Sequence, residues 1–286
     1  MKKILKQTGK ALCYFLLFIG AQAIVTYIFG AIYLMKNKMA LVQINETLNM
    51  DGMELFLNDY SKYILENILI TLIVSELITL IFLWAFFAIR KKKLSEEAMI
   101  KKLDKQKIIP IGLLGAILSL IVLILIDLLP IPESILTQYD VNTNVLSSDS
   151  LILSIIVAVI CAPVVEEVIF RGLILSRLKQ AMNPIIALIL SSLVFAITHG
   201  QILWMSYTFL LGIVCGIVAL RTGSIVASII LHMFFNLFGI FASNISVPEY
   251  ILKIVCLFLL IIFIILFYIV MKKSETKTIE LKKIVP

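Results

Sequence analysis

The sequence predicts an all-α membrane protein, a polytopic bundle of about eight transmembrane helices. Hydrophobic residues occupy 61% of its 286 positions, and charged residues only 15%. Apolar runs close to the roughly 20 residues that cross a bilayer recur along the whole chain. This composition excludes an ordinary water-soluble domain, in which about a quarter of the residues are charged.

The predicted spans follow the apolar runs in chain order. They cover about residues 11–35, 63–89, 108–129, 151–178, 184–199, 203–220, 224–243 and 250–271. The fifth and sixth are short for a full crossing. The first begins like a cleavable signal, with basic residues and an A-x-A sequence that ends at residue 23, but its apolar run continues to residue 35. We therefore expect an uncleaved helix.

The basic residues predict the orientation of the bundle. With a cytoplasmic N-terminus, 20 of the 25 Lys and Arg residues fall on the cytoplasmic side, and one, Arg171, lies within the membrane. The positive-inside rule then places both termini in the cytoplasm. The chain divides into leading helices (1–149) with a basic cytoplasmic loop (90–107), a core (150–243), and a final helix with a basic cytoplasmic tail (244–286).

The net charge of +7 does not indicate a nucleic-acid partner. The basic residues lie in loops beside apolar runs and form no patch with aromatic residues, so the lipid bilayer is the partner they predict. Loop 90–107 is expected to be either a short amphipathic helix on the membrane surface or a solvated charged loop. The four cysteines show no CxxC spacing and indicate neither disulfides nor a zinc knuckle. The sequence makes no prediction of oligomeric state.

The stretch APVVEEVIFRG (162–172) places three ionisable residues inside an apolar run. A charge at mid-bilayer costs about 3 kcal/mol on insertion scales, so such residues are functional candidates. Glu167 and Arg171, at i and i+4, are expected to form a buried ion pair that holds helices together. Glu166 points about 100° away around the helix and has no local cation, so another requirement must explain it.

The two histidines of the chain, His199 and His232, also lie in apolar runs. A single histidine on an apolar face is usually a packing residue. At about 1.5 Å per residue, however, both histidines, Glu166 and Asn236 fall about 14 to 22 Å from the predicted cytoplasmic helix ends. Convergence of these side chains from three helices on one depth indicates a site.

The chemistry of this set suits hydrolysis of an amide. A carboxylate with an imidazole can deprotonate water, and His232 with Asn236, at i and i+4, can donate hydrogen bonds to a developing oxyanion. Alternatively, Glu166, His199 and His232 could bind zinc, with water as the fourth ligand. The absence of an HExxH motif makes the metal the less favoured alternative.

Three motifs resemble those of the CAAX-processing and bacteriocin-processing (CPBP, Abi) intramembrane proteases. The resemblance covers about residues 150–240, and the first 150 residues resemble only the family's variable leading helices. EEVIFR (Glu166, Glu167, Arg171) matches EExxxR, FAITH (Phe195, His199) matches FxxxH, and HMFFN (His232, Asn236) matches HxxxN.

The resemblance implies an intramembrane endopeptidase of the type II CAAX prenyl endopeptidase kind that needs no cofactor. By this resemblance Glu166 and His199 would activate the attacking water, His232 and Asn236 would form the oxyanion hole, and Glu167 and Arg171 would support them. The family was long classified among metalloproteases, and a zinc form would use Glu166, His199 and His232. A metal-free glutamate mechanism is the favoured account.

The substrate is expected to be a membrane-associated peptide or protein. It would be a prenylated C-terminus in a eukaryote, or a leader peptide, pheromone precursor or membrane protein in a bacterium. The excess of Lys over Arg, 21 to 4, favours a bacterial cell membrane. Two other classes of function stay open: a secondary transporter, although no internal repeat is present, and a non-proteolytic immunity or regulatory protein on the same scaffold.

Three further features of the apolar runs carry expectations. Glu76, near mid-span, either lines the cavity, pairs with a cation or forms an interhelical hydrogen bond. Pro163 removes the hydrogen bond to the carbonyl of residue 159 and is expected to kink the helix just before Glu166. Gly212 and Gly216 form a small-xxx-small pair, which predicts close helix packing.

Overall fold

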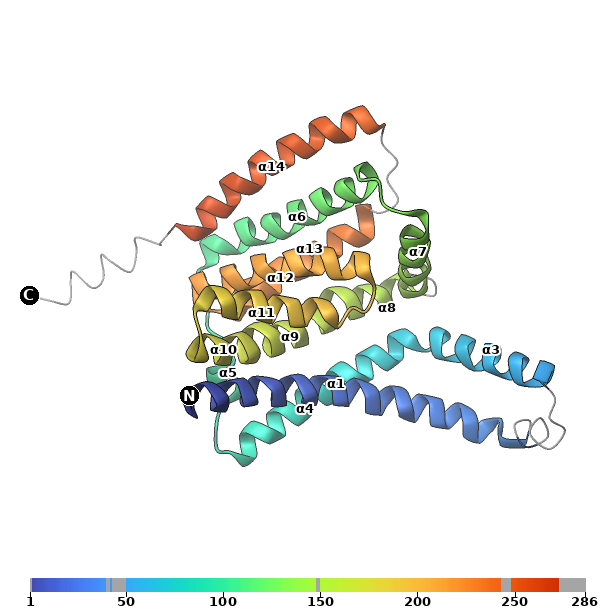
Figure 1. The fold of residues 1–286 in the computed structure, drawn as a ribbon. Helices are drawn as coiled ribbons and strands as arrows, with labels where there is room; N and C mark the ends of the chain where they lie inside the picture. The colour runs from blue at the N-terminus through green and yellow to red at the C-terminus, as the bar shows by residue number, and fades with distance from the viewer. Residues whose placement is uncertain (1, 40–41, 43–49, 148–149, 243–247, 273–286) are drawn as a thin grey trace, which may run out of the picture.

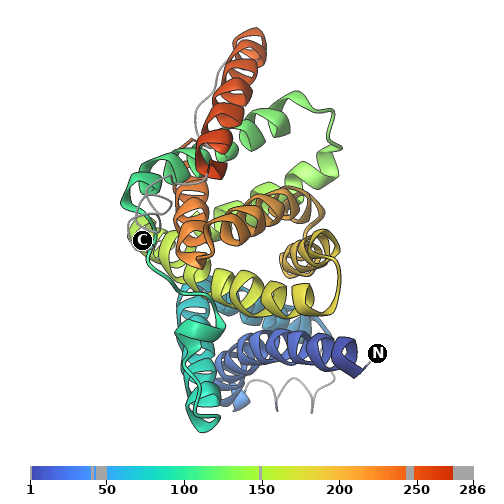
Figure 2. The ribbon, with the colours of Figure 1, turned by 90° about the vertical axis from the view of Figure 1, so that its left-hand side faces the viewer.

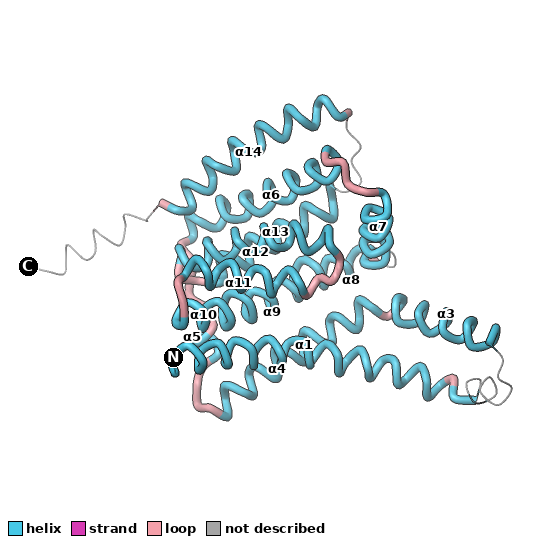
Figure 3. The backbone as a smooth tube through the Cα atoms, viewed as in Figure 1, coloured by secondary structure: helices cyan, strands magenta, loops and turns pink. Residues whose placement is uncertain are grey.

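The protein is a bundle of helices without a strand among the residues that the structure describes (Figures 1 and 3). This computed structural model describes residues 2–39, 42, 50–147, 150–242 and 248–272. The α-helices are α1 (Lys2–Lys36), α3 (Met50–Glu66), α4 (Ile68–Ile89), α5 (Leu94–Glu97), α6 (Ile108–Leu128), α7 (Glu133–Ser147), α8 (Leu151–Ile155), α9 (Ala162–Glu166), α10 (Ser176–Ala181), α11 (Pro184–Ile197), α12 (Ile202–Thr222), α13 (Ile225–Ala242) and α14 (Glu249–Met271). The all-α prediction is confirmed.

Seven helical spans in the described part of the chain are long and apolar enough to cross a membrane. The fifth predicted span, 184–199, is shorter than expected, because α11 ends at Ile197 after 14 residues. At 1.5 Å per residue it covers about 21 Å, less than the roughly 30 Å of hydrocarbon. The polytopic bundle is thus observed, with seven long spans and one short apolar helix.

The two ends of the described chain lie at the same end of the bundle (Figure 1). There the Lys107 ammonium donates to the carbonyl oxygen of Val270 at 3.0 Å, and Arg221 Nε donates to that of Met271 at 2.8 Å. Loop 90–107 and α10 lie at this end as well, so the segments with the predicted cytoplasmic charges meet on one face. Most of the predicted basic tail lies outside the described residues, and the orientation across the membrane stays a prediction.

The helical segment from α8 to α10 runs between two groups of helices. Figures 1 and 2 show α1 and α4 on one flank and α6 and α14 on the other. Residues of this segment, among them Phe170 and Leu173, pack with Phe18 of α1 and Leu83 of α4 in one buried cluster. A second cluster joins α6, α12, α13 and α14. The predicted core segment therefore occupies the middle of the molecule.

Two helices longer than ten residues, α3 and α7, were not predicted as separate elements. A break at Asn67 separates α3 from α4, so the second span starts at Ile68 and not near residue 63. Helix α7 lies across the end of the bundle opposite the termini (Figure 1). Both α3 and α7 contain many polar residues, which is why apolar runs alone did not predict them.

Loop 90–107 is closer to the solvated charged loop than to the amphipathic helix, since most of its charged residues are exposed. Only Leu94–Glu97 is α-helical, and the next residue, Ala98, is fully buried. A Cβ atom on Gly172 would lie 2.9 Å from the Cβ of Ala98, so the loop packs directly on the central segment. Glu97 forms an ion pair with Arg177. The sequence analysis did not foresee these two tertiary contacts, because it considered only the charges of the loop.

The same loop also contacts the start of α13. The Met99 carbonyl accepts a hydrogen bond from the Ile225 amide at 3.2 Å, and the Ser224 hydroxyl donates to the Lys101 carbonyl. Met99 adopts a left-handed backbone conformation, with φ of 55°. Loop 90–107 therefore closes the terminus-bearing end of the bundle between α10 and α13.

Glycines set the distances between the helices around the centre. The Gly212 and Gly216 prediction is confirmed: a Cβ on Gly212 would lie 3.0 Å from the Cβ of Ser192, and one on Gly216 would lie 2.2 Å from Leu188 Cδ1. Helix α6 packs more extensively on α13 than any other helix pair does. A Cβ on Gly115 of α6 would lie only 2.1 Å from the Leu231 carbonyl oxygen.

We predict that Gly115→Ala destabilises the protein by about 1 to 3 kcal/mol, the usual cost of overpacking. The new methyl group would meet backbone on α13, which cannot rotate away as a side chain could. Gly20→Ala is the matched control, because nothing lies within 4 Å of its Cβ position. Thermal unfolding in detergent should show a lower midpoint for Gly115→Ala alone; equal midpoints would contradict this packing.

Candidate active site

The central helical segment changes its hydrogen-bonding pattern twice. Two π-helical stretches, η2 (Ile156–Cys161) and η3 (Glu167–Leu175), flank the short α9. Glu166 is the last residue of α9, and Glu167 is the first of η3. Such wide turns inside α-helices often occur at functional sites.

Pro163 explains one unusual contact of Asn236. In η2 the Ala162 amide donates to the Val157 carbonyl, five residues back, so the Ala158 carbonyl would need the amide of residue 163. Proline has no N–H. Asn236 Nδ2 donates to the Ala158 oxygen instead, at 2.6 Å. Pro163 lies in the first turn of α9, where the hydrogen-bonding pattern changes just before Glu166. The kink expected at this proline stays a prediction.

Glu167 and Arg171 form the expected ion pair. Arg171 Nη1 donates to Glu167 Oε1 at 2.8 Å, and the two side chains are 1% and 0% exposed. Because an isolated charge would cost several kcal/mol at this burial, each group depends on the other.

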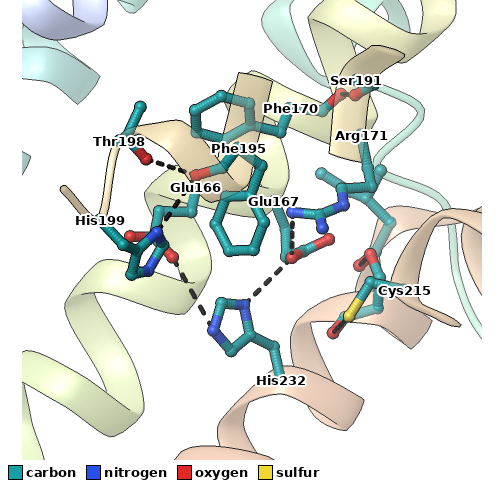
Figure 4. Close-up of polar contacts among 12 residues, drawn as sticks. Glu166, Glu167, Phe170, Arg171, Ser191, Phe195, Thr198, His199, Cys215 and His232 are labelled. Atoms are coloured by element: carbon teal, nitrogen blue, oxygen red, sulfur yellow. Dashed lines mark hydrogen bonds and ion pairs between the residues drawn. The ribbon is translucent and has the colours of Figure 1, made fainter. Parts of the chain in front are cut away.

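The His232 ring lies between the two glutamates. Its Nδ1 lies 3.1 Å from Glu167 Oε1, and its Nε2 lies 3.8 Å from Glu166 Oε2 (Figure 4). Since the Glu167 carboxylate can only accept, we assign the proton of His232 to Nδ1. In this ring orientation Nε2 is the nitrogen on the side of Glu166. Glu166 is the more accessible of the two glutamates, with its side chain 14% exposed.

Phe195 is the spacer around which these groups are arranged. The Arg171 guanidinium carbon lies 4.2 Å from the centroid of its ring, within cation–π range. The same ring contacts His199 and His232 edge-on, with centroids 4.9 and 5.9 Å apart. The FxxxH motif includes Phe195 but does not indicate these contacts. They could have been inferred only from the presence of one cation and two imidazoles at the same depth in apolar helices.

His199 lies in the turn after α11, not inside the helix. Its Nδ1 lies 3.1 Å from the Phe195 carbonyl oxygen, which also accepts from the Thr198 hydroxyl at 2.6 Å. This contact orients the ring and leaves Nε2 without that constraint. In Figure 4 the His199 ring and the Glu166 carboxylate both lie beside Phe195.

The structure brings most of the predicted site residues together, and Asn236 contacts the backbone beside them. Glu166, Glu167, Arg171 and His232 share direct contacts, with His199 beside Phe195. Asn236 is on the same face of α13 as His232, but its amide contacts Ala158. The sequence analysis did not foresee this anchoring contact.

Glu76 of α4 is buried, and no ion pair of the described residues includes it. Helix α4 packs against η2 and α9, and Oε2 of Glu76 is buried without a hydrogen-bond partner among the described residues. The expected ion pair is thus not formed within the described residues, and the other two expectations for Glu76 stay predictions.

No group of three His, Cys, Asp or Glu side chains in the described ranges is arranged to hold a metal ion, and this includes Glu166, His199 and His232. What the arrangement offers is a carboxylate facing an imidazole nitrogen, with a second carboxylate and a guanidinium holding that imidazole in place.

Comparisons with known proteins single out the same part of the chain. Residues 148–238 match the family model described as type II CAAX prenyl endopeptidase Rce1-like. An uncharacterised 24.3 kDa protein of Escherichia coli is 29% identical over 92 residues, which make up 30% of this chain and 42% of that protein. The chain thus spans about two fifths of the length of this curated relative. No solved structure matches the chain.

We predict that Arg171→Met lowers the free energy of unfolding by about 3 to 5 kcal/mol, because Glu167 would remain as a buried charge without its cation. The double variant Glu167→Gln/Arg171→Met should recover most of this loss, since it removes both charges. Folded yield and thermal midpoints in detergent measure the difference. Equal destabilisation in the two variants would show that the side-chain volume of Arg171 matters and its pairing does not.

Proposed function

Residues 148–238 belong to the Rce1-like family of type II CAAX prenyl endopeptidases, and on this premise we propose that the protein is a glutamate-dependent intramembrane endopeptidase. It hydrolyses a peptide bond in a membrane-associated protein or peptide. The family match and the seven apolar spans support the more general statement that this is an integral membrane protein with a protease-family segment.

The observation that carries the proposal is the position of His232 between two glutamates. A chain that needed only a helix-to-helix ion pair would need Glu167 and Arg171, but not an imidazole whose second nitrogen faces Glu166 at 3.8 Å. Intramembrane ionisable groups are costly, so a third and a fourth such group require a function. Acid–base chemistry on water is the function that this pair of groups supports.

In the proposed reaction Glu166 and His199 hold the attacking water. Glu166 removes a proton from the water, and the resulting hydroxide attacks the carbonyl carbon of the scissile bond. His199 contributes Nε2, since its Nδ1 is oriented by the Phe195 carbonyl. Glu166 later passes a proton to the leaving amine, so that the carboxylate is regenerated.

His232 and Asn236 are the proposed oxyanion donors. Because Nδ1 of His232 donates to Glu167, donation from Nε2 requires the doubly protonated ring, which takes up its second proton from solvent before the reaction. The proton that Glu166 removes from the water therefore remains available for the leaving amine. An asparagine amide has two N–H groups. One of those of Asn236 bonds Ala158, which leaves the other for the oxyanion. Glu167 and Arg171 position His232 and do not contact the substrate.

We propose that the reaction needs no metal and takes place in a bacterial cell membrane. Asparagine is a poor zinc ligand but a good hydrogen-bond donor, which favours the oxyanion role for the face that carries His232. The substrate would be a leader peptide, pheromone precursor or membrane protein. Bacteriocin processing is one such activity.

Glu166→Gln should abolish peptide cleavage while the protein stays folded, because an amide keeps the size of the side chain but accepts no proton from water. The assay reconstitutes purified protein with a library of membrane-anchored peptides and detects products by mass spectrometry. Glu96→Gln is the matched control, since that side chain is 72% exposed. Full activity of Glu166→Gln would remove Glu166 from the mechanism.

Exhaustive chelation should leave the cleavage rate unchanged, and elemental analysis of active protein should find well under one zinc ion per chain. The physical reason is that the proposed base and the oxyanion donors are all protein groups. His232→Ala should lower turnover about a hundredfold, as for other lost oxyanion donors. Stoichiometric zinc, whose removal and return switches the activity off and on, would refute the metal-free mechanism.

A further inference from the structure

A cavity of about 700 Å³ opens beside His199. One wall is α7, through Thr137, Gln138 and Val141, and the other is the turn from His199 to Ile202. This volume is within the range of about 300 to 1,000 Å³ that is usual for ligand sites. Through this cavity the candidate catalytic residue His199 is accessible from the surface.

The wall formed by α7 is fixed to the bundle. Gln201 is buried, and its side-chain amide donates to the Ile135 carbonyl at 3.3 Å while its side-chain oxygen accepts from the Trp204 amide. The rings of Tyr139 and Trp204 pack edge to face, with centroids 6.5 Å apart. The turn is sharp because Gly200 adopts a left-handed conformation, with φ of 71°. The cavity is therefore defined at both walls by specific contacts.

Helix α7, which forms one wall of this cavity, crosses the end of the bundle opposite the termini (Figure 1). The other end is closed below the site by loop 90–107. There Ala98 packs on Gly172 directly after Arg171, and the Met99 and Lys101 carbonyls bond the start of α13, the helix that carries His232. An extended peptide could therefore approach His199 through the cavity. From the end that carries the termini, the packed backbone of loop 90–107 stands in its way.

The lining fits an extended peptide. Apart from His199, its side chains are uncharged, and Thr137 and Gln138 supply hydrogen-bonding groups. A peptide that is cleaved at membrane depth must leave helical structure, so its backbone N–H and C=O groups need such partners. Helix α7 carries acidic residues only: Glu133 and Asp140 are exposed on it, and it contains no Lys or Arg. This environment disfavours anionic segments, a free C-terminal carboxylate among them.

We propose that the substrate reaches the site through this cavity, as an extended, uncharged or cationic segment presented on the side of the membrane opposite the termini. By the distribution of basic residues this is the non-cytoplasmic side. The inference rests on the proposed peptidase function and adds the side of access and the charge of the substrate. It assigns Thr137 and Gln138 to substrate binding, from outside the three sequence motifs.

The test displays one peptide on either side of the membrane. The probe is the peptide that the reconstitution library shows to be cleaved fastest, fused to a single transmembrane helix in its two opposite orientations and expressed with the protein in cells. Cleavage is expected only when the peptide is displayed opposite the protein's termini. Exchange of one Lys for Glu beside the scissile bond should lower kcat/KM on the order of fivefold or more.

Gln138→Cys provides the second arm. A membrane-impermeant thiol reagent applied to intact cells should modify this variant and lower its cleavage rate at least tenfold, and bound probe peptide should protect it. Ser61→Cys, exposed on α3 away from the cavity, is the control for modification without inhibition, and the wild type controls for the native cysteines. Lys102→Cys, on loop 90–107, should react only after the cells are permeabilised.

The outcomes separate this inference from the peptidase proposal. Cleavage of the probe only on the terminus-bearing side, or modification of Gln138→Cys without inhibition, would overturn the access route and leave the peptidase function standing. Failure of the unmodified protein to cleave any library peptide would overturn the function and the inference with it. Cleavage on the opposite side, blocked by modification at Gln138→Cys, would support both.

Discussion

The buried ion pair between Glu167 and Arg171 is the constraint on which the centre of this protein depends. At 0% and 1% exposure these charges persist only because each neutralises the other at 2.8 Å. The surrounding residues accommodate the pair: Phe195 lies against the guanidinium, and Gly212 gives it room, since a Cβ there would lie 3.1 Å from Arg171 Nη2. The pair also offers Oε1 of Glu167 to His232, and this contact fixes the ring that faces Glu166.

A second constraint comes from the backbone. Pro163 has no N–H to donate in the π-helical pattern that precedes it, and in a membrane no water is at hand to replace a lost backbone hydrogen bond. Asn236 supplies the missing donor from α13. One helix therefore makes two polar contacts with the central segment, through His232 and through Asn236. Breaking either would leave a buried polar group unsatisfied, which explains how two adjacent turns of α13 are held in register with the glutamates.

Much of this site was predictable from the sequence because it depends on local spacing. The i and i+4 positions of Glu167 and Arg171 predicted their pair, and equal depths in separate apolar runs predicted that Glu166 and His232 approach each other. The Ala158 contact was not predictable, because an α-helical count pairs the position of Pro163 with the carbonyl of residue 159, whereas the π-helical spacing pairs it with residue 158. The role of Phe195 as a spacer depends on three helices at once, which no single motif describes.

The fold, like the site, was predictable only in part from the sequence. Apolar runs predicted the long spans, but the polar helices α3 and α7 left no such signal, and α11 ends early where the chain turns at Gly200. Loop 90–107 has the composition of a surface segment, yet Ala98 is buried against Gly172. Tertiary contacts made by small residues decide this placement, and hydropathy does not record them.

The central claim is that a water molecule, activated within the membrane, attacks a peptide bond directly. Single-turnover cleavage of the best library peptide in oxygen-18 water, followed by mass spectrometry of the new carboxyl terminus, tests it most directly. The account predicts one heavy oxygen in the product of the first turnover. A first-turnover product that carries only ordinary oxygen would show a side-chain carboxylate acting as the nucleophile, and the absence of any product would contradict the account altogether.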